Sequence, residues 1–151
     1  MLIDARATGL AESSFDFICS NNTFEHIYPN VLSDILKEFK RVLKADGLMS
    51  HFIDLSDNFA HFDHSITIYN FLRFSTDRWN MIDNSIQPQN RLRWKEYKEK
   101  YQELDIPITE ESIREGELEL LAQVDVHPQF DAFSAEELAI SHGYLISKFD
   151  P

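Results

Sequence analysis

The sequence predicts an α/β fold, because two short apolar runs are separated by an amphipathic stretch. Residues 15–20 and 48–54 have the length and apolar content of buried strands. Between them, apolar side chains recur at helical spacing from Pro29 to Lys44. Strand, helix and strand joined by short loops predict a right-handed parallel crossover, and therefore an α/β sheet.

The composition is that of one soluble, folded domain over residues 1–151. Hydrophobic residues make up 43% and aromatic residues 13%, which supplies a core that disordered acidic segments lack. The net charge of −12 repels phosphate backbones and anionic lipids, so we expect neither nucleic-acid nor membrane partners. The single Cys19 can form no intramolecular disulfide, and no secretion signal or membrane-spanning stretch is visible. These features predict a cytoplasmic protein.

The helix after the first strand has the clearest pattern in the sequence. The strand ends at the polar residues 21–23, and Pro29 suits the first turn of the helix. Asp46 and Gly47 break the helical pattern before the second strand.

Helices and loops alternate through the middle of the chain. We expect a helix over residues 65–74, followed by a short helix that Ser75 caps. Residues 85–93 are rich in amides and favour a loop. An amphipathic helix is predicted over residues 94–104, and Pro107 marks its end.

The last third of the chain closes the sheet. Residues 108–114 are expected to form a strand and residues 117–122 a helical turn. Ser134 begins a capping box that opens a helix, which Gly143 is expected to end. A final strand over residues 144–149 gives a sheet of three or four strands.

Several segments together carry a resemblance. They are Asp4-Ala5, Leu10, Ser14-Phe15-Asp16-Phe17-Ile18-Cys19-Ser20, Phe24-Glu25-His26-Ile27 and Leu43-Lys44-Ala45-Asp46-Gly47. This combination resembles the second half of a class I S-adenosylmethionine-dependent methyltransferase of the small-molecule type. The likeness covers residues 3–55, and residues 134–149 fit the family's closing helix and strand more loosely. Ala45-Asp46-Gly47 stands where the family has Pro-Gly-Gly, and Gly47 still allows the turn.

The resemblance implies a partial Rossmann-like sheet, made of the equivalents of strands 4 to 7 with flanking helices and lacking the first three strands. The family holds its cofactor at the carboxyl ends of the first strands, where a glycine-rich turn approaches it. The 4 glycines of this chain are isolated and form no such turn. We therefore expect a truncated copy or a fragment of the fold, for which binding of S-adenosylmethionine by this chain alone is open.

A sheet without its first strands predicts an exposed edge between Phe15 and Ser20. In the family this strand pairs with the first strand, so the edge keeps unpaired N–H and C=O groups. We expect a homodimer through this region, formed strand to strand or by covering each other's apolar faces. The alternative is that residues 1–10 or an added helix cover the edge within one chain.

Four residues are candidates for contact with S-adenosylmethionine. By resemblance, Asp4 accepts a hydrogen bond from the adenine amino group and the backbone of Ala5 contacts the ring; the alternative is an ordinary polar N-terminus. Asn21 and Asn22 follow the carboxyl end of a strand, where open α/β sheets bind ligands. Because Asn also favours turns, binding and turn-forming roles are both open for this pair.

Glu25 and His26 are the candidates on the acceptor side. By resemblance, His26 lies near the methyl acceptor, where an imidazole can remove a proton from a hydroxyl group at neutral pH. Glu25 is expected to contact the substrate. Methyl transfer itself depends mainly on positioning and exclusion of water. The alternative is that His26 is a polar residue at a helix entry.

Two loops are expected to supply further substrate contacts. By resemblance, the loop that contains His61 shapes the acceptor pocket. Residues 87–93 bring together amides and two guanidinium groups, so Asn90, Arg91 and Arg93 can hydrogen-bond a polyol or pair with a phosphate. A plain surface loop is the alternative. Several His and Asp residues surround His61 at irregular spacing, and we predict no metal site there.

Two functions of different class remain. Hydrolase chemistry is not predicted, because Cys19 sits within an apolar strand and no nucleophile motif is present. One hypothesis is an S-adenosylmethionine-dependent methyltransferase acting on a small molecule, incomplete or inactive as the isolated chain. The other is a cofactor-free remnant of the fold that acts as a binding or oligomerisation module. Titration with S-adenosylmethionine or S-adenosylhomocysteine distinguishes them.

Overall fold

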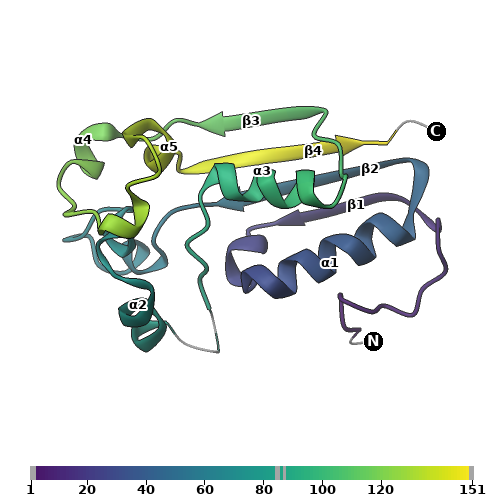
Figure 1. The fold of residues 1–151 in the computed structure, drawn as a ribbon, viewed down its shortest axis with the longest axis horizontal. Helices are drawn as coiled ribbons and strands as arrows, with labels where there is room; N and C mark the ends of the chain where they lie inside the picture. The colour runs from purple at the N-terminus through teal and green to yellow at the C-terminus, as the bar shows by residue number, and fades with distance from the viewer. Residues whose placement is uncertain (1–2, 84–85, 87, 150–151) are drawn as a thin grey trace.

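The computed structural model describes residues 3–83, 86 and 88–149, which form an α/β fold around a four-stranded sheet (Figure 1). The strands are β1 (Phe15–Asn21), β2 (Leu43–Asp54), β3 (Glu110–Arg114) and β4 (His142–Lys148), in the spatial order β1-β2-β4-β3. β1 and β2 are parallel, whereas β4 is antiparallel to both β2 and β3. The sheet is therefore mixed, with β4 as its one reversed strand.

The predicted parallel crossover is confirmed. Helix α1 (Pro29–Val42) begins at Pro29 and buries its apolar side, including Leu32 and Leu36, against the sheet. β2 begins at Leu43, directly after α1, and not at residue 48 as expected. The earlier start reflects the pairing of Leu43 with Phe15 ahead of an irregularity in the register.

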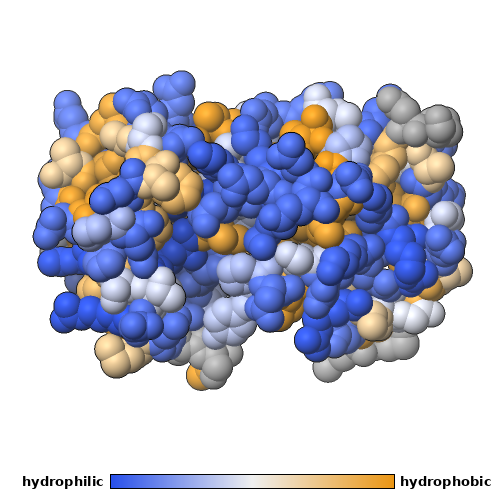
Figure 2. All heavy atoms as spheres, viewed as in Figure 1, coloured by the Kyte–Doolittle hydropathy of each residue, from blue (hydrophilic) through white to orange (hydrophobic). Residues whose placement is uncertain are grey.

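Helix α3 (Trp94–Glu103) covers the same face of the sheet as α1 (Figure 1). Tyr97 and Tyr101 of this helix are fully buried against Met49 and Ile53 of β2. The remaining surface on this side is largely hydrophilic (Figure 2).

A second, smaller core lies beyond the carboxyl ends of β1 and β2 (Figure 1). It is built around Tyr69, Phe71, Trp79 and Phe130. The short helices that surround this core are α2 (Thr76–Ile82), α4 (Leu118–Leu121) and α5 (Ala135–Ala139).

Two of the predicted helix caps are confirmed and one predicted helix is wrong. Ser75 accepts a hydrogen bond from the Arg78 N–H at the start of α2, and Ser134 forms the capping box of α5. Residues 65–74 contain only a 3-10 helix, Asn70–Arg73. Asp63 accepts hydrogen bonds from the Ser65 N–H and hydroxyl, a local side-chain turn that competes with helix formation.

The expectation of a buried first strand is also wrong. Phe15, Phe17 and Cys19 are exposed, because β1 is an edge strand and the helices cover only one face of the sheet. Gly143 does not end a helix; it lies inside β4. The close approach of Trp94 explains why glycine occupies that strand position.

The described part of the N-terminal segment runs along α1 and does not cover β1. Thr8 donates to Glu38 through its backbone N–H and its hydroxyl, and Arg41 donates to the carbonyl of Leu10. In residues 3–10 no backbone hydrogen bond reaches β1. Met1, Leu2, Ser85 and Gln87, which belong to segments discussed above, lie outside the described residues.

No helix in residues 3–83, 86 and 88–149 combines the length and the apolar character that crossing a membrane requires.

Candidate functional site

The loop after β1 brings Glu25 and His26 to the carboxyl ends of the parallel strands. Asn22 adopts a left-handed conformation with φ of 47°, and its N–H donates to the carbonyl of Phe52 at 3.2 Å. The chain thus turns sharply and enters the 3-10 helix Phe24–His26. Within it Glu25 is buried, whereas the side chain of His26 keeps 26% of its surface exposed.

The imidazole of His26 is held by one nitrogen. Its Nδ1 lies 2.9 Å from the carbonyl oxygen of Pro88. Because a carbonyl oxygen only accepts, Nδ1 carries the hydrogen, and in the neutral ring Nε2 carries the lone pair. Nε2 lies 4.0 Å from Oε1 of Glu25, too far for a hydrogen bond. His26 therefore has one basic nitrogen without a hydrogen-bonding partner among the described residues.

Glu25 is a buried carboxyl group with an unusual proton affinity. Burial raises its pKa to about 7, and the nearby Asp54 carboxylate adds to this effect. The backbone N–H groups of Glu25 and Asp54 oppose the shift. Its Oε2 is buried without a hydrogen-bond partner in the part of the chain that the structure describes. Near neutral pH, both the protonated and the ionised form of Glu25 are therefore populated.

Asp54 and His142 lie side by side at the end of the sheet. Oδ1 of Asp54 accepts hydrogen bonds from the N–H and hydroxyl of Ser56 at 2.8 and 2.6 Å. Nε2 of His142 lies 3.4 Å from the same oxygen. The register places Asn21 on the same sheet face as this pair, because Asn21 pairs with Phe52 and Asp54 follows two residues later. Polar side chains of three strands thus meet at this end.

Asn90 fixes the loop that carries His26. Its Nδ2 donates to the carbonyls of Phe24 and Ile27, both at 2.8 Å, and its N–H donates to the carbonyl of Glu25 at 2.8 Å. Its Oδ1 accepts from the hydroxyl of Tyr97 at 3.0 Å. Every polar group of the Asn90 side chain therefore has a protein partner.

The two arginines expected to bind substrate also hydrogen-bond backbone carbonyls. Nη1 of Arg91 donates to the carbonyls of Phe71 and Phe74, and burial lowers the pKa of Arg91 to about 10. The guanidinium lies 5.4 Å from the ring centroids of Trp79 and Phe130. Arg93 is fully buried. It donates to the carbonyls of Leu55, Leu138 and Ile140 at 2.9, 3.0 and 2.7 Å.

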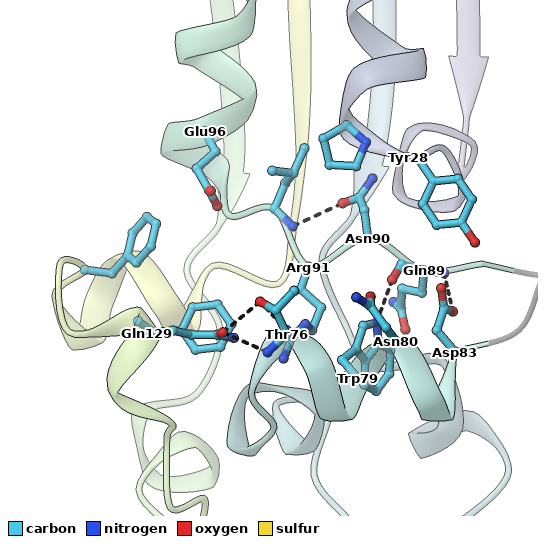
Figure 3. A pocket seen from close by; sticks show the side chains of 14 residues that line it. Tyr28, Thr76, Trp79, Asn80, Asp83, Gln89, Asn90, Arg91, Glu96 and Gln129 are labelled. Carbon is cyan, nitrogen blue, oxygen red and sulfur yellow. Dashed lines mark hydrogen bonds between the residues drawn. The ribbon is translucent and has the colours of Figure 1, made fainter.

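A pocket of about 350 Å³ is lined by Asn90 and by Tyr28, two residues after His26 in the chain (Figure 3). Arg91 lies near its centre, with Glu96 on one wall and Tyr28 on another. Oε2 of Glu96 accepts from the Arg93 N–H at 2.8 Å, and burial raises the pKa of Glu96. The other residues that line the pocket and are labelled in Figure 3 are Thr76, Trp79, Asn80, Asp83, Gln89, Asn90 and Gln129.

Sequence reasoning missed most of this pocket. Tyr28 precedes α1, Trp79 lies in α2 and Glu96 lies in α3, and the three share no motif or spacing. The only local signal was the amide-rich run that supplies Asn90 and Arg91. That run marks the centre of the pocket wall but not the residues opposite it.

The remaining candidates are not brought to the His26 loop. Asp4 forms an ion pair with Arg6 at 2.7 Å, and this guanidinium lowers the pKa of Asp4 to about 2. Neither Asp4 nor Ala5 contacts Asn21 or Asn22 through any hydrogen bond or ion pair of the described residues. Asp4 and Ala5 belong to the segment beside α1. His61 is exposed in the 3-10 helix Asn58–His61. Within the described ranges, no three His, Cys, Asp or Glu side chains are grouped to hold a metal ion.

Comparison with known proteins shows what the fold resembles. Residues 1–50 match the model of the methyltransferase domain. Structures similar to the chain include a geranyl diphosphate C-methyltransferase from Streptomyces coelicolor A3(2), solved with Mg²⁺, geranyl diphosphate and S-adenosyl-L-homocysteine. It is 13% identical with a TM-score of 0.59, and the match covers 99% of this chain and 53% of that one. The fold is that of a class I methyltransferase.

Two further structures share the class I methyltransferase fold. A proposed methyltransferase from Bacillus halodurans C-125 is 14% identical with a TM-score of 0.55, and the match covers 98% of this chain and 75% of that one. The cyclase SpnF is 14% identical with a TM-score of 0.57, and the match covers 98% of this chain and 55% of that one. This chain thus spans about half the length of two of these three proteins. No curated protein sequence matches it.

Proposed function

We propose that this chain forms the acceptor side of an S-adenosylmethionine-dependent methyltransferase that acts on a small molecule. The observation that carries the proposal is the orientation of His26. Its Nδ1 donates to Pro88, and its Nε2 is left with a lone pair at the carboxyl ends of β1 and β2. Ligands of α/β sheets bind at this end. In this proposal the sheet corresponds to the later strands of the family fold.

The described residues fit the cofactor in part. Asn21 and Asn22 are exposed at the end of β1 and are available to hydrogen-bond ribose hydroxyl groups. Asp4 fits less well, because both of its carboxylate oxygens bond Arg6. S-adenosylmethionine, when bound, supplies a methyl group that its sulfonium activates for in-line displacement. The complete cofactor site is therefore proposed to use residues beyond these.

His26 is proposed to accept the proton of the methyl acceptor. The oxygen or nitrogen of the acceptor forms a new bond to the transferred methyl carbon as the bond between that carbon and the sulfonium sulfur breaks. The proton of the acceptor hydroxyl or amine then passes to Nε2 of His26. The carbonyl of Pro88 stabilises the resulting imidazolium through Nδ1–H, as a hydrogen bond to a charged donor. Ionised Glu25, 4.0 Å away, adds a favourable charge. Asn90 holds the loop carbonyls and keeps this arrangement fixed.

A cofactor-free binding module is the second candidate. The specific observation in its favour is that Asn90, Arg91 and Arg93 all bond the protein's own backbone. These side chains offer few free groups to a substrate. In this case the pocket beside Asn90, and not a methyl-transfer site, would be the functional feature.

Calorimetric titration with S-adenosylhomocysteine, followed by a methyl-transfer assay on hydroxyl and amine acceptors, tests the choice. The methyltransferase proposal predicts micromolar binding by the wild type and by His26→Gln, with transfer lost only in His26→Gln. His64→Gln is the matched control, because this histidine is exposed and lies outside the loop. Wild-type protein that gives no heat of binding rejects the enzyme and supports the module.

A further inference from the structure

One face of the four-stranded sheet is uncovered in the described structure. α1 and α3 both pack on the face that carries Met49, Ile53 and Leu145. Pairing and alternation place Phe17, Leu48, Phe52, Tyr144 and Ile146 on the opposite face. None of these five side chains is buried. We call this surface the open face.

The open face is apolar at its centre. Phe17 is 51% exposed and Tyr144 is 45% exposed. The tilted rings of Phe52 and Tyr144 have centroids 4.7 Å apart, so the aromatic surface is continuous across β2 and β4. Large exposed apolar patches of this kind mark interaction surfaces.

Charge on the open face is balanced, although the chain as a whole carries −12. The acidic side chains placed there by the register are Asp54 and Glu110, and the basic ones are Arg114 and Lys148. Two copies of the chain repel each other through most of their surfaces. They do not repel each other through this face.

The two edges of the sheet differ in their protection. β3 is short and carries Glu110, Glu111 and Arg114, which discourage pairing with another strand. β1 has seven residues and one charged side chain, Asp16, which is neutralised by Lys44 at 2.6 Å. The β1 edge is therefore less protected against the approach of another molecule than the β3 edge.

We propose that a second copy of this chain covers the open face, forming an isologous dimer around Phe17, Phe52 and Tyr144. Four strands of 5 to 12 residues present on the order of 500 Å² of sheet surface. A standard interface buries about 800 Å² per partner, so a dimer through this smaller face is expected to be weak. Symmetry supplies the complementarity, because each copy presents the same apolar centre and the same balanced charges.

The dimer brings the second copy next to the candidate site. Asn21, Asp54 and His142 lie on the open face, at the end of the sheet where β1 and β2 finish. A second copy packed there forms a wall beside these three side chains and limits the access of water to them. The dimer does not depend on methyl transfer, so it holds or fails independently of the proposed function.

Sedimentation velocity from 1 to 200 μM tests the dimer. The wild type is expected to shift from monomer to dimer across this range, and Phe17→Lys to remain monomeric. Phe62→Lys is the matched control: Phe62 is 85% exposed and lies outside the sheet, so this variant should dimerise like the wild type. Circular dichroism checks that each variant folds, and Tyr144→Lys replaces Phe17→Lys if the latter does not.

The single cysteine gives a second readout. Cys19 is exposed and lies on β1 beside Phe17, so a dimer protects it. Its rate of reaction with a maleimide should fall several-fold between 1 and 200 μM in the wild type and in Phe62→Lys, but not in Phe17→Lys. A wild type that stays monomeric at 200 μM overturns the proposal, as does a dimer that Phe17→Lys and Tyr144→Lys leave intact. A heterologous partner on this face would give the first of these results.

Discussion

The indole ring of Trp94 lies directly against the backbone of Gly143. A Cβ atom added to Gly143 would fall 2.4 Å from Cη2 of Trp94, closer than real carbon contacts occur. Here α3 rests on β4 with no side chain between them. Glycine in the middle of a strand usually weakens it, so this position has a specific packing reason.

Gly143→Ala should destabilise the protein by about 1–3 kcal/mol, because the added methyl group overpacks a filled interior. Urea denaturation measures the loss. In a Trp94→Phe background the same substitution should cost less. The three atoms that the added Cβ would contact, Cη2, Cζ3 and Cζ2, belong to the outer ring of the indole, and phenylalanine lacks them. An equal cost in both backgrounds would show that the two residues are not coupled.

Local signals in the sequence were sufficient for α1, for the starts of α2 and α5 and for the first crossover, but not for residues 65–74, where the predicted helix is wrong. The apolar spacing after Pro29 predicts α1, and Ser75 and Ser134 predict the starts of two helices, because each signal acts within four residues. Burial could not be predicted in the same way. Phe17 looks like a core residue, and it is exposed because nothing in the described chain covers its face of the sheet.

The site was predicted only in its local part. Glu25 and His26 are adjacent, and the turn at Asn22 that positions them is visible in the sequence. The hydrogen bonds of Asn90 and Arg93 could not be foreseen, because they join residues between 38 and 66 positions apart. A pattern within one segment carries no information about such partners.

The stability of the protein should depend on pH through Glu25. Its pKa rises from the usual 4.5 to about 7 on folding, so the folded state favours the protonated form. This contribution is fully present below pH 4.5 and is lost as the pH rises through 7. Relative to Glu25→Gln, the wild type should therefore lose roughly 3 kcal/mol of unfolding free energy between these limits.

Urea denaturation of the two proteins from pH 4.5 to 8 measures this difference. Burial lowers the pKa of His51 to about 4, so His51 works in the opposite direction and removes stability as the pH falls below 6.5. Because both proteins retain His51, its effect cancels in the comparison. A difference that does not change with pH would mean that Glu25 titrates normally in the folded protein.

Arg93 should be the most sensitive of the predicted site residues, through stability and not through binding. It is fully buried and joins the carbonyl of Leu55, after β2, to those of Leu138 and Ile140 at the end of α5. Arg93→Met leaves these carbonyls buried without donors and should cost about 2–4 kcal/mol. Arg93→Lys should recover only part of this, because an ammonium group lacks the planar fork that spans three acceptors.

Arg114→Met is the control, since Arg114 is exposed, and it should change stability by less than about 0.5 kcal/mol. Amide hydrogen exchange in Arg93→Met should rise first in α5 and in the loop after β2; equal stability of the Arg93 and Arg114 variants would refute this role.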